Sequence, residues 1–375
     1  MFRDGKILWA NEEAHRLLSR PAGALIGIQL DQRLMSNKGT QAVHDIPVEV
    51  TSAVYVDNVE LRPLDASSLW VDMQVERVDD WCVLCTFTKP ADGSEVRFLD
   101  AGEVLEAQHA RHFRERIRSG LVRNEFLLVY QPKVDMPSGT VIGVEALIRW
   151  QHPERGFLLP ASFIPSIEDH ELVERLGDWV IGEAMQQAAI WRAEGLQTAI
   201  SVNISPRHLL RPDFVSRLAC HLNHFPQLPT GVLELEILET TAIKDFDAVA
   251  NFIRACNALG VPVTLDDFGT GYSSLTYLRR LPVSALKLDQ SFVRGMLDEH
   301  EDQAIVRGIL VMAHGLGLKA IAEGVESKAH GDALMVLGCT MGQGYGIAKP
   351  LPADKIPEWI ANFERDPPWG RREGV

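Results

Sequence analysis

The chain has 375 residues, of which 46% are hydrophobic and 23% are charged, and its formal net charge is −14. These proportions are close to those of an average soluble globular protein and exclude a disordered, collagen-like or coiled-coil chain. The acidic balance argues against a nucleic-acid polymer or an anionic membrane as a partner, because both need a basic surface. The sequence contains no apolar run of the roughly 18 residues that a membrane span requires, and its cysteines are few and scattered. We therefore expect a cytoplasmic protein.

The first 98 residues contain short β-like runs separated by clusters of Gly, Pro, Asn and Asp. The predicted strands are Lys6–Trp9, Pro47–Val54, Trp70–Arg77 and Trp81–Thr88, and a short helix is predicted over Glu12–Leu18. A linker signal follows at residues 89–94. From Phe98 to Gly120 the apolar residues recur at helical spacing, which predicts a connecting helix.

From Glu125 onward, apolar runs typical of strands alternate with helical stretches, which predicts a mainly parallel sheet with helical crossovers. The runs are Phe126–Val134, Val141–Trp150, Ala199–Ile204, Val232–Leu238, Val261–Leu265, Ala285–Leu288, Ala320–Val325 and Met341–Ile347. The clearest helical stretches are His170–Trp191, Phe246–Leu259 and Glu301–Leu316. Eight strands in about 230 residues favour a TIM-like (β/α)8 barrel over an open sheet. The first two runs are close together, so we expect a hairpin in which the first strand runs antiparallel to the others.

Polar residues gather where these runs end, and the active site of a parallel barrel is built from the carboxyl ends of its strands. In chain order they are Glu145, Asn203, Glu236, Asp266, Asp267, Lys287, Glu323 and Gln343. Several buried carboxylates are costly unless they are paired or bound to metal. Carboxylate and amide oxygens suit Mg²⁺, Mn²⁺ or Ca²⁺, and no His or Cys shares these strand ends. Two ions about 3.5–4 Å apart, bridged at Asp266–Asp267, would suit in-line attack on a phosphodiester.

The glycine-rich segment after Asp267 allows two interpretations. It could cradle a phosphate, although it lacks the last glycine and the downstream acidic residue of a dinucleotide fingerprint. Alternatively, its glycines give conformational freedom to a loop that touches the metal site and gates activity. We favour the second interpretation.

Motifs along the barrel region resemble the signature of the EAL-domain cyclic di-GMP phosphodiesterases over about residues 110–360. They are Tyr130-Gln-Pro-Lys-Val-Asp135, Glu145-Ala-Leu147 followed by Ile-Arg149-Trp150, Ser201-Val-Asn203, Glu234-Leu-Glu236-Ile-Leu-Glu239, Asp266-Asp-Phe-Gly-Thr-Gly271, Leu286-Lys287-Leu-Asp289, Ala322-Glu323-Gly-Val-Glu326 and Gly342-Gln343-Gly-Tyr345. The front part, with Gly5-Lys-Ile-Leu-Trp-Ala-Asn11 and Leu25-Ile-Gly27, resembles a PAS sensor domain. That second resemblance identifies no ligand for the sensor.

The EAL resemblance implies hydrolysis of cyclic di-GMP to linear pGpG with two Mg²⁺ or Mn²⁺ ions. Carried over by position, the metal ligands would be Glu145, Asn203, Glu236, Asp266, Asp267 and Glu323. Glu323, Lys287 and Glu145 would be catalytic, with Lys287 orienting the attacking water and Glu323 acting as general base or as a ligand through water. Substrate would contact Gln131, Arg149, Asp289 and Gln343, and Glu239 would anchor the glycine-rich loop. Relatives commonly have Thr where this chain has Leu238, which removes a hydroxyl but no metal ligand.

These observations divide the chain into four parts. Residues 1–90 are expected to form a PAS-like sensor or dimerisation domain with its first strand absent or altered, and residues 91–120 a linker helix. Residues 121–362 would form the phosphodiesterase barrel, and residues 363–375 a flexible tail. The resemblance also implies a homodimer.

Three functions remain in competition. The first is an active phosphodiesterase regulated by the front domain. The second is a degenerate EAL domain that binds cyclic di-GMP and signals to a protein partner, and the third is a docking scaffold. A receptor would be expected to lose metal ligands or the catalytic Lys and Glu, whereas this chain keeps them all. We therefore favour the enzyme.

Overall fold

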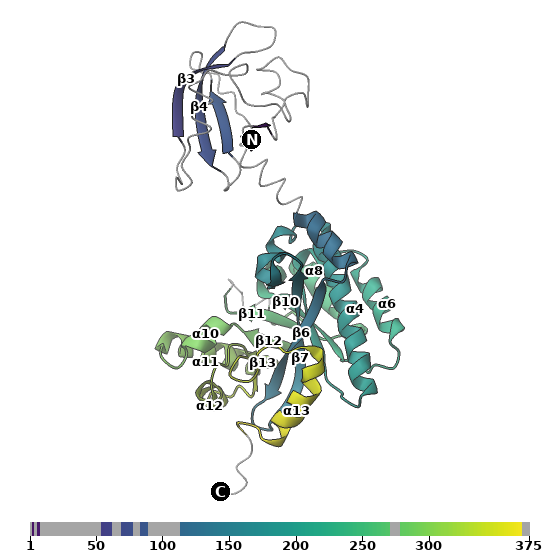
Figure 1. Ribbon diagram of the computed structural model, residues 1–375. Helices are drawn as coiled ribbons and strands as arrows, with labels where there is room; N and C mark the ends of the chain where they lie inside the picture. Colours follow the sequence, from purple (N-terminus) through teal and green to yellow (C-terminus); the bar gives the residue numbers. More distant parts are fainter. Residues whose placement is uncertain are drawn as a thin grey trace. The chain divides into compact units, whose positions relative to one another are not determined.

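The chain forms two compact units, Met1–His112 and Phe113–Val375 (Figure 1). The computed structural model describes residues 113–270 and 278–369, together with five strands of the first unit. The expected helix Glu12–Leu18 and the Pro47–Ala53 part of a predicted strand lie outside the described residues.

The first unit contains a five-stranded antiparallel sheet in the order β2-β1-β5-β4-β3. Its strands are β1 (Phe2–Arg3), β2 (Lys6–Ile7), β3 (Val54–Leu61), β4 (Leu69–Arg77) and β5 (Val83–Thr88). Buried residues alternate along two of them, with Val59 and Leu61 on β3 and Val71 and Met73 on β4. This spacing of two places them on one face of the sheet. The sequence predicted β2, β4 and β5, but it missed β1 and ended its second strand where β3 begins.

The second unit is a closed eight-stranded barrel. Its strands are β6 (Phe126–Asp135), β7 (Thr140–His152), β9 (Ile200–Ile204), β10 (Leu233–Leu238), β11 (Val263–Phe268), β12 (Ala285–Leu288), β13 (Lys319–Ala322) and β14 (Met341–Gly342). Neighbours from β7 through β14 are parallel, whereas β6 pairs antiparallel with both β7 and β14 and so closes the barrel. The short strand β8 (Gly156–Leu158) extends the end of β7 as a hairpin. The expected barrel with an antiparallel first strand is confirmed.

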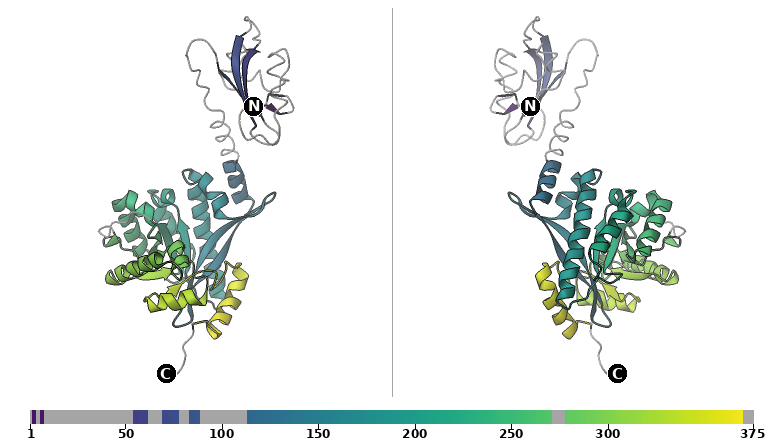
Figure 2. Two further views of the ribbon diagram at one scale, coloured as in Figure 1. Left: turned by 90° about the vertical axis from the view of Figure 1, so that its left-hand side faces the viewer. Right: turned by 90° about the vertical axis from the view of Figure 1, so that its right-hand side faces the viewer.

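Helices surround the strands on the outside (Figure 1; Figure 2). They comprise a helix over residues 113–122, α4 (Glu171–Ala193), α5 (Pro206–Leu209), α6 (Phe214–His224), α7 (Glu239–Lys244), α8 (Phe246–Ala258), α10 (Gln290–Gly295), α11 (His300–Gly315), α12 (Lys328–Val336) and α13 (Ile356–Arg365), with 3-10 turns at Pro160–Ser162, Ile164–Ser166 and Ala353–Lys355. α4 illustrates why they form. His170 caps its first turn by accepting from the Leu172 amide at 3.2 Å, and Leu172, Leu176 and Val180 bury one face.

The helix over residues 113–122 packs on the barrel through a small second core. Ile117 is buried beside Trp150 of β7, whose ring stacks on Phe126 with centroids 5.0 Å apart. The Glu125 carboxylate accepts a hydrogen bond from the Trp150 indole at 3.1 Å and pairs with Arg116 at 2.7 Å. These contacts fix the end of β7 at the place where the chain enters the barrel.

Strands β13 and β14 end earlier than the sequence predicted. β13 stops at Ala322 because Gly324 has a positive φ of 70°, a conformation that ends the extended run. β14 stops at Gly342 because the following turn packs directly on the chain after β13. A Cβ on Gly344 would lie 2.3 Å from the Val325 backbone nitrogen. Both turns carry the site residues Glu323 and Gln343 just beyond their strands.

The C-terminal segment expected to be flexible from residue 363 is in part packed against the barrel. α13 continues to Arg365, and Trp369 is only 7% exposed. The Trp369 indole donates to the Lys328 carbonyl at 3.2 Å, and its ring lies over Gly331 of α12, where a Cβ would clash at 2.4 Å. For residues 363–369 the prediction is wrong: Pro and Gly marked the segment as irregular, whereas burial of the large indole ring of Trp369 holds it in place.

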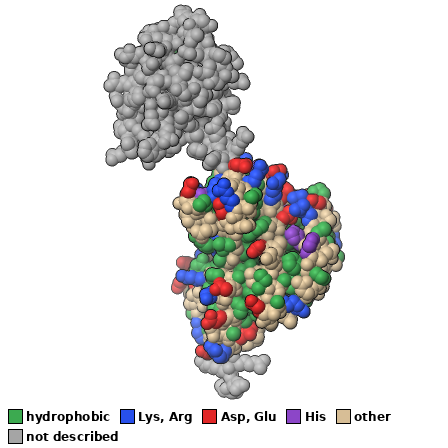
Figure 3. Space-filling view, turned by 45° about the vertical axis from the view of Figure 1, so that its right-hand side comes forward, with side chains coloured by type: hydrophobic (Ala, Val, Ile, Leu, Met, Phe, Trp, Pro, Cys, Tyr) green, Lys and Arg blue, Asp and Glu red, His purple; other side chains and the backbone are tan. Residues whose placement is uncertain are grey.

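The surface of the second unit carries both signs of charge. Figure 3 shows acidic and basic side chains interspersed over one face. Among the described residues, none of the helices has the length and apolar character needed to cross a membrane.

Two helical glycines with different surroundings provide a test of the packing. Alanine at exposed Gly308 of α11 would meet nothing within 4 Å, so Gly308→Ala should stabilise the protein by about 1 kcal/mol through helix propensity. Alanine at Gly177 of α4 would place its Cβ 2.3 Å from Nδ1 of buried His208, so Gly177→Ala should destabilise by about 1–3 kcal/mol. Urea unfolding of both variants measures the difference, and equal shifts in the same direction would contradict the packing.

Candidate functional site

The strand register brings the predicted site residues together at one end of the barrel. Glu145 on β7 lies opposite Gln131 on β6, and Asn203 on β9 lies opposite Glu236 on β10. Because parallel strands run in the same direction, their carboxyl ends meet on one rim of the barrel. We call the five carboxylates gathered there the acidic rim: Glu145, Glu236, Asp266, Asp267 and Glu323.

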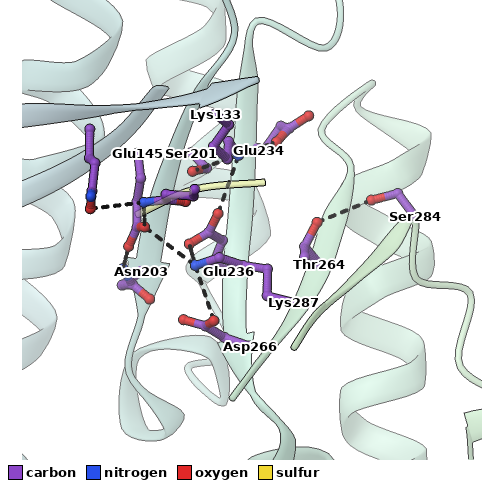
Figure 4. Close-up of polar contacts among 12 residues, drawn as sticks. Lys133, Glu145, Ser201, Asn203, Glu234, Glu236, Thr264, Asp266, Ser284 and Lys287 are labelled. Atoms are coloured by element: carbon purple, nitrogen blue, oxygen red, sulfur yellow. Dashed lines mark hydrogen bonds and ion pairs between the residues drawn. The ribbon is translucent and has the colours of Figure 1, made fainter. Parts of the chain in front are cut away.

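The ammonium group of Lys287, on β12, lies at the centre of this rim. Its Nζ is 2.7 Å from Glu236 Oε2, 2.7 Å from Glu323 Oε1, 3.0 Å from Asp266 Oδ1 and 3.4 Å from Glu145 Oε2. Figure 4 shows this lysine pointing into the group of carboxylates. Lys287 is 0% exposed, so these contacts replace all of its hydration.

Three amide side chains converge near Glu145. Asn203 Nδ2 donates to Glu145 Oε1 at 2.7 Å, and Gln343 Nε2 donates to Glu145 Oε2 at 2.7 Å. Gln343 Nε2 also donates to Gln131 Oε1 at 3.1 Å, and Gln131 donates to the Ala348 carbonyl at 3.0 Å. Glu145 is therefore fixed by amide donors and by Lys287, all of which orient its oxygens toward the rim.

An irregularity in β11 allows two consecutive aspartates to serve one site. Successive side chains of a regular strand point to opposite faces. Here the register with β12 shifts between Leu265 and Phe268, and Asp267 adopts a left-handed φ of 53°. The Asp267 amide donates to Asp266 Oδ1 at 3.1 Å. This uncommon backbone for a non-glycine residue is typical of functional sites.

The rim offers two sets of carboxylate oxygens spaced for metal binding. Glu145, Glu236 and Asp266 have ligand atoms within 4.8 Å of one another, and so do Asp266, Asp267 and Glu323. Asp266 belongs to both sets, which is the arrangement expected of a carboxylate that bridges two ions. Five carboxylates against one central ammonium leave four negative charges, which is the charge that two divalent cations would neutralise.

Burial and the excess of negative charge raise the pKa of four of the five rim carboxylates. Burial and the neighbouring carboxylates Asp266 and Glu145 outweigh Lys287 and raise the pKa of Glu323 to about 8. Burial, Asp266 and Asp289 raise the pKa of Asp267 to about 6. Burial likewise raises the pKa of Glu145 and of Asp266 above the ordinary values, against the pull of Lys287. Such shifts are typical of sites that bind cations or transfer protons.

Glu236 differs from the other four. Burial alone would raise its pKa, but Lys287 and Lys133 lower it to about 2. Lys133 on β6 belongs to the motif Tyr130-Gln-Pro-Lys-Val-Asp135, but the sequence did not predict that it contacts a site residue. The signal was its alternation with Gln131, because residues two apart on a strand face the same way.

The expected loop anchor has a direct partner. The Gly269 amide donates to Glu239 Oε2 at 2.8 Å, which ties the start of the glycine-rich loop to α7. Residues 271–277 of that loop lie outside the described residues. Leu238 is the N-cap of α7 and offers no side-chain hydrogen bond to the first turn of that helix.

Two expected substrate residues lie at the edge of the site. Arg149 is buried on β7, and its guanidinium donates to the Ile148 carbonyl at 2.8 Å. Burial lowers the pKa of Arg149, and Glu145 lies close enough to oppose that shift. Asp289 caps α10 by accepting from the Ser291 amide at 2.9 Å, and it neighbours Asp267. The structure therefore brings Asp289 to the second set of carboxylates.

The profile of the EAL domain matches residues 114–350. The chain belongs to the EAL domain family. Cyclic di-GMP phosphodiesterase PA2567 of Pseudomonas aeruginosa is 40% identical over 235 residues, covering 63% of this chain and 40% of that protein. The bifunctional diguanylate cyclase/cyclic di-GMP phosphodiesterase MucR of the same species is 38% identical over 260 residues, covering 69% of this chain and 38% of that protein. The chain thus spans about two fifths of the length of these curated relatives.

A solved EAL structure shares the barrel. The PaMucR phosphodiesterase in complex with c-di-GMP is 39% identical and superimposes with a TM-score of 0.63. The match covers 65% of this chain and 99% of that one, so it concerns the barrel unit.

Stability of the metal-free protein should fall as pH rises from about 4.5 to about 8. In that window the folded chain keeps a proton on Glu323, whose ordinary pKa of 4.5 is raised to about 8, and the unfolded chain releases it. Glu323→Gln removes this contribution and should flatten the dependence. Urea unfolding in the presence of a chelator at both ends of the window measures it, with Glu358→Gln on exposed α13 as control. A wild-type stability that rises over this window relative to Glu323→Gln would contradict the assignment.

Proposed function

We propose that the chain is a metal-dependent phosphodiesterase that hydrolyses cyclic di-GMP to linear pGpG. The observation that carries this proposal is the acidic rim, in which five converging carboxylates face one buried lysine in a chain of the EAL family. Relatives named cyclic di-GMP phosphodiesterases and a related barrel solved with c-di-GMP support this substrate.

We propose that two divalent cations, Mg²⁺ or Mn²⁺, bind the rim. The donor set fits such ions because it consists of carboxylate and amide oxygens, which hard cations prefer. Glu145, Asn203, Glu236 and Asp266 would hold one ion, and Asp266 and Asp267 the other, with Glu323 close by. When bound, the ions would supply Lewis acidity and lower the pKa of water.

The protein side chains then have separate tasks. Lys287 would donate to the attacking water and hold it in line with the phosphorus atom. Glu323 would accept its proton, because a carboxylate is a sufficient base for an acidified water. The new P–O bond forms as the bond from phosphorus to the ribose 3′ oxygen breaks, and the released alkoxide takes up a proton. Glu145 would keep the site assembled through its amide donors and Lys287.

Substrate would lie over the same end of the barrel. Arg149 would bind a phosphate, since a guanidinium matches phosphate geometry. Gln131, Gln343 and Asp289 would contact the nucleotide, and the Gln343 Oε1 atom is buried with no hydrogen-bond partner among the described residues. Glu239 would hold the glycine-rich loop in place for turnover through Gly269.

We further propose that residues 1–90 form a PAS-like sensor, residues 91–120 a linker helix, and residues 121–362 the catalytic barrel. The five-stranded antiparallel sheet of the first unit and the packing of the helix at residues 113–122 on β7 support this division. We also propose that the protein is a cytoplasmic homodimer in which the first unit regulates the barrel through this helix. We propose no nucleic-acid polymer and no membrane as partners.

The first experiment mixes the purified full-length chain with cyclic di-GMP and Mg²⁺ or Mn²⁺ and follows pGpG by chromatography. We expect metal-dependent product from the wild type. Glu145→Gln should lose about 100-fold or more in rate, because a metal site contributes several kcal/mol of transition-state stabilisation. Glu358→Gln, an equivalent change on exposed α13, should behave as the wild type.

Tight binding of intact cyclic di-GMP without product would contradict the enzyme and favour the receptor. The same assay on a variant that lacks residues 1–98 separates a receptor from a barrel inhibited by its own front unit. Product appearing only after this deletion would show inhibition.

A further inference from the structure

Below the acidic rim, the barrel interior holds a second buried lysine. Lys133 of β6 is 2% exposed, and its Nζ lies 3.0 Å from Ser201 Oγ, 3.0 Å from Glu234 Oε2 and 3.4 Å from Glu236 Oε1. Figure 4 shows this lysine between Glu234 and Glu236, on the side of Glu236 away from Asp266. These three partners belong to β9 and β10, so Lys133 links β6 to the strands that carry two of the proposed metal ligands.

A glycine faces this lysine across the β6–β7 hairpin. Its cross-strand neighbour on β7 is Gly143. A Cβ on Gly143 would lie 3.2 Å from the Ala199 carbonyl oxygen and 3.5 Å from Lys133 Cε. The lysine stem therefore packs alongside Gly143, where a Cβ would be crowded by the Ala199 carbonyl, and the polar atoms at the tip of the stem satisfy the ammonium. The buried ammonium of Lys133 therefore has three polar partners within 3.4 Å.

Glu236 is held from both sides as a result. Its Oε2 is 2.7 Å from Lys287, and its Oε1 is 3.4 Å from Lys133. Charges alternate along this line, from Glu323 through Lys287, Glu236 and Lys133 to Glu234, whose side chain is 27% exposed. Ser201, whose Oγ lies 3.0 Å from Lys133 Nζ, also hydrogen-bonds the Glu236 carboxylate, so Lys133 and Ser201 together restrain the rotation of this carboxylate in addition to Lys287.

We propose that Lys133 is a positioning residue for metal binding, which fixes the Glu236 carboxylate in the orientation that faces the cations. The proposal rests on the metal-dependent function proposed above and adds a residue that does not itself touch metal or substrate. Carboxylate ligands are oriented by the hydrogen bonds of their outer oxygens, and loss of such a partner typically costs about 10–100-fold in metal affinity.

An alternative role would be purely structural, with Lys133 serving only to neutralise Glu234. The two roles are separated by removing the ion pair as a unit. Replacing one member of a buried pair leaves an uncompensated charge, whereas replacing both with neutral residues of similar size is often tolerated. Lys133→Met alone tests both roles, and Lys133→Met combined with Glu234→Gln tests the positioning of Glu236.

The experiment measures Mn²⁺ binding to the full-length protein by the electron paramagnetic resonance signal of free Mn²⁺. We expect Lys133→Met and the double variant each to bind Mn²⁺ about 10–100-fold more weakly than the wild type. Glu234→Gln alone should bind within a factor of about two of the wild type, since Lys133 still holds Glu236. Activity should half-saturate at correspondingly higher Mn²⁺ and recover at saturation, because the ligands themselves remain.

A double variant that binds Mn²⁺ as tightly as the wild type would overturn the proposal. If Lys133→Met does not fold, as thermal unfolding will show, the double variant alone decides. Wild-type protein that binds no Mn²⁺ would instead overturn the metal-dependent function, and the positioning role with it. Weaker binding in the variants, together with a wild type that binds metal but cleaves no cyclic di-GMP, would support Lys133 while contradicting the enzyme.

Discussion

The structure of the site depends on one ammonium group in the middle of a carboxylate cluster. Lys287 contacts four carboxylates from four other strands or strand ends, and it has no exposed surface. A buried charge of this kind is tolerated only when its partners are close and well oriented. Because these partners come from strands around the barrel, the charge of Lys287 is compensated only when the barrel is closed. The site is therefore built by the fold as a whole.

The charge balance also explains why the site is suited to cations. Burial raises the pKa of four of the five carboxylates in the protein alone, and their mutual repulsion adds to the effect because one ammonium cannot neutralise all five. Glu236 is the exception because it is held between two lysines, with its pKa lowered to about 2. The rim thus combines one carboxylate that stays ionised with others that become ionised when positive charge arrives. A bound cation would lower the pKa of these carboxylates, because an opposite charge nearby favours the ionised form.

The remaining architecture positions this rim. The antiparallel first strand contributes Gln131 and Lys133 to the interior, and the hairpin to β7 places Gln131 opposite Glu145. The small core around Trp150 joins the entering helix to β7, the strand that carries Glu145 and Arg149. The helix at residues 113–122 is therefore packed against the strand that carries two of the proposed site residues.

The sequence by itself determined the barrel, the antiparallel first strand and the set of strand-end residues. It did so because apolar runs, their spacing and the rule for parallel barrels are local or topological properties. It placed Asp266 and Asp267 in one site, but it could not show how two consecutive strand residues reach the same site, since that needs the irregularity of β11 and the left-handed φ of Asp267. The sequence also could not predict the ion pair between Lys133 and Glu236 or the packing of Trp369 against α12, because each contact joins residues far apart in the chain. Side-chain packing and charge compensation are set by three-dimensional neighbours, and only the tertiary structure decides which neighbours meet.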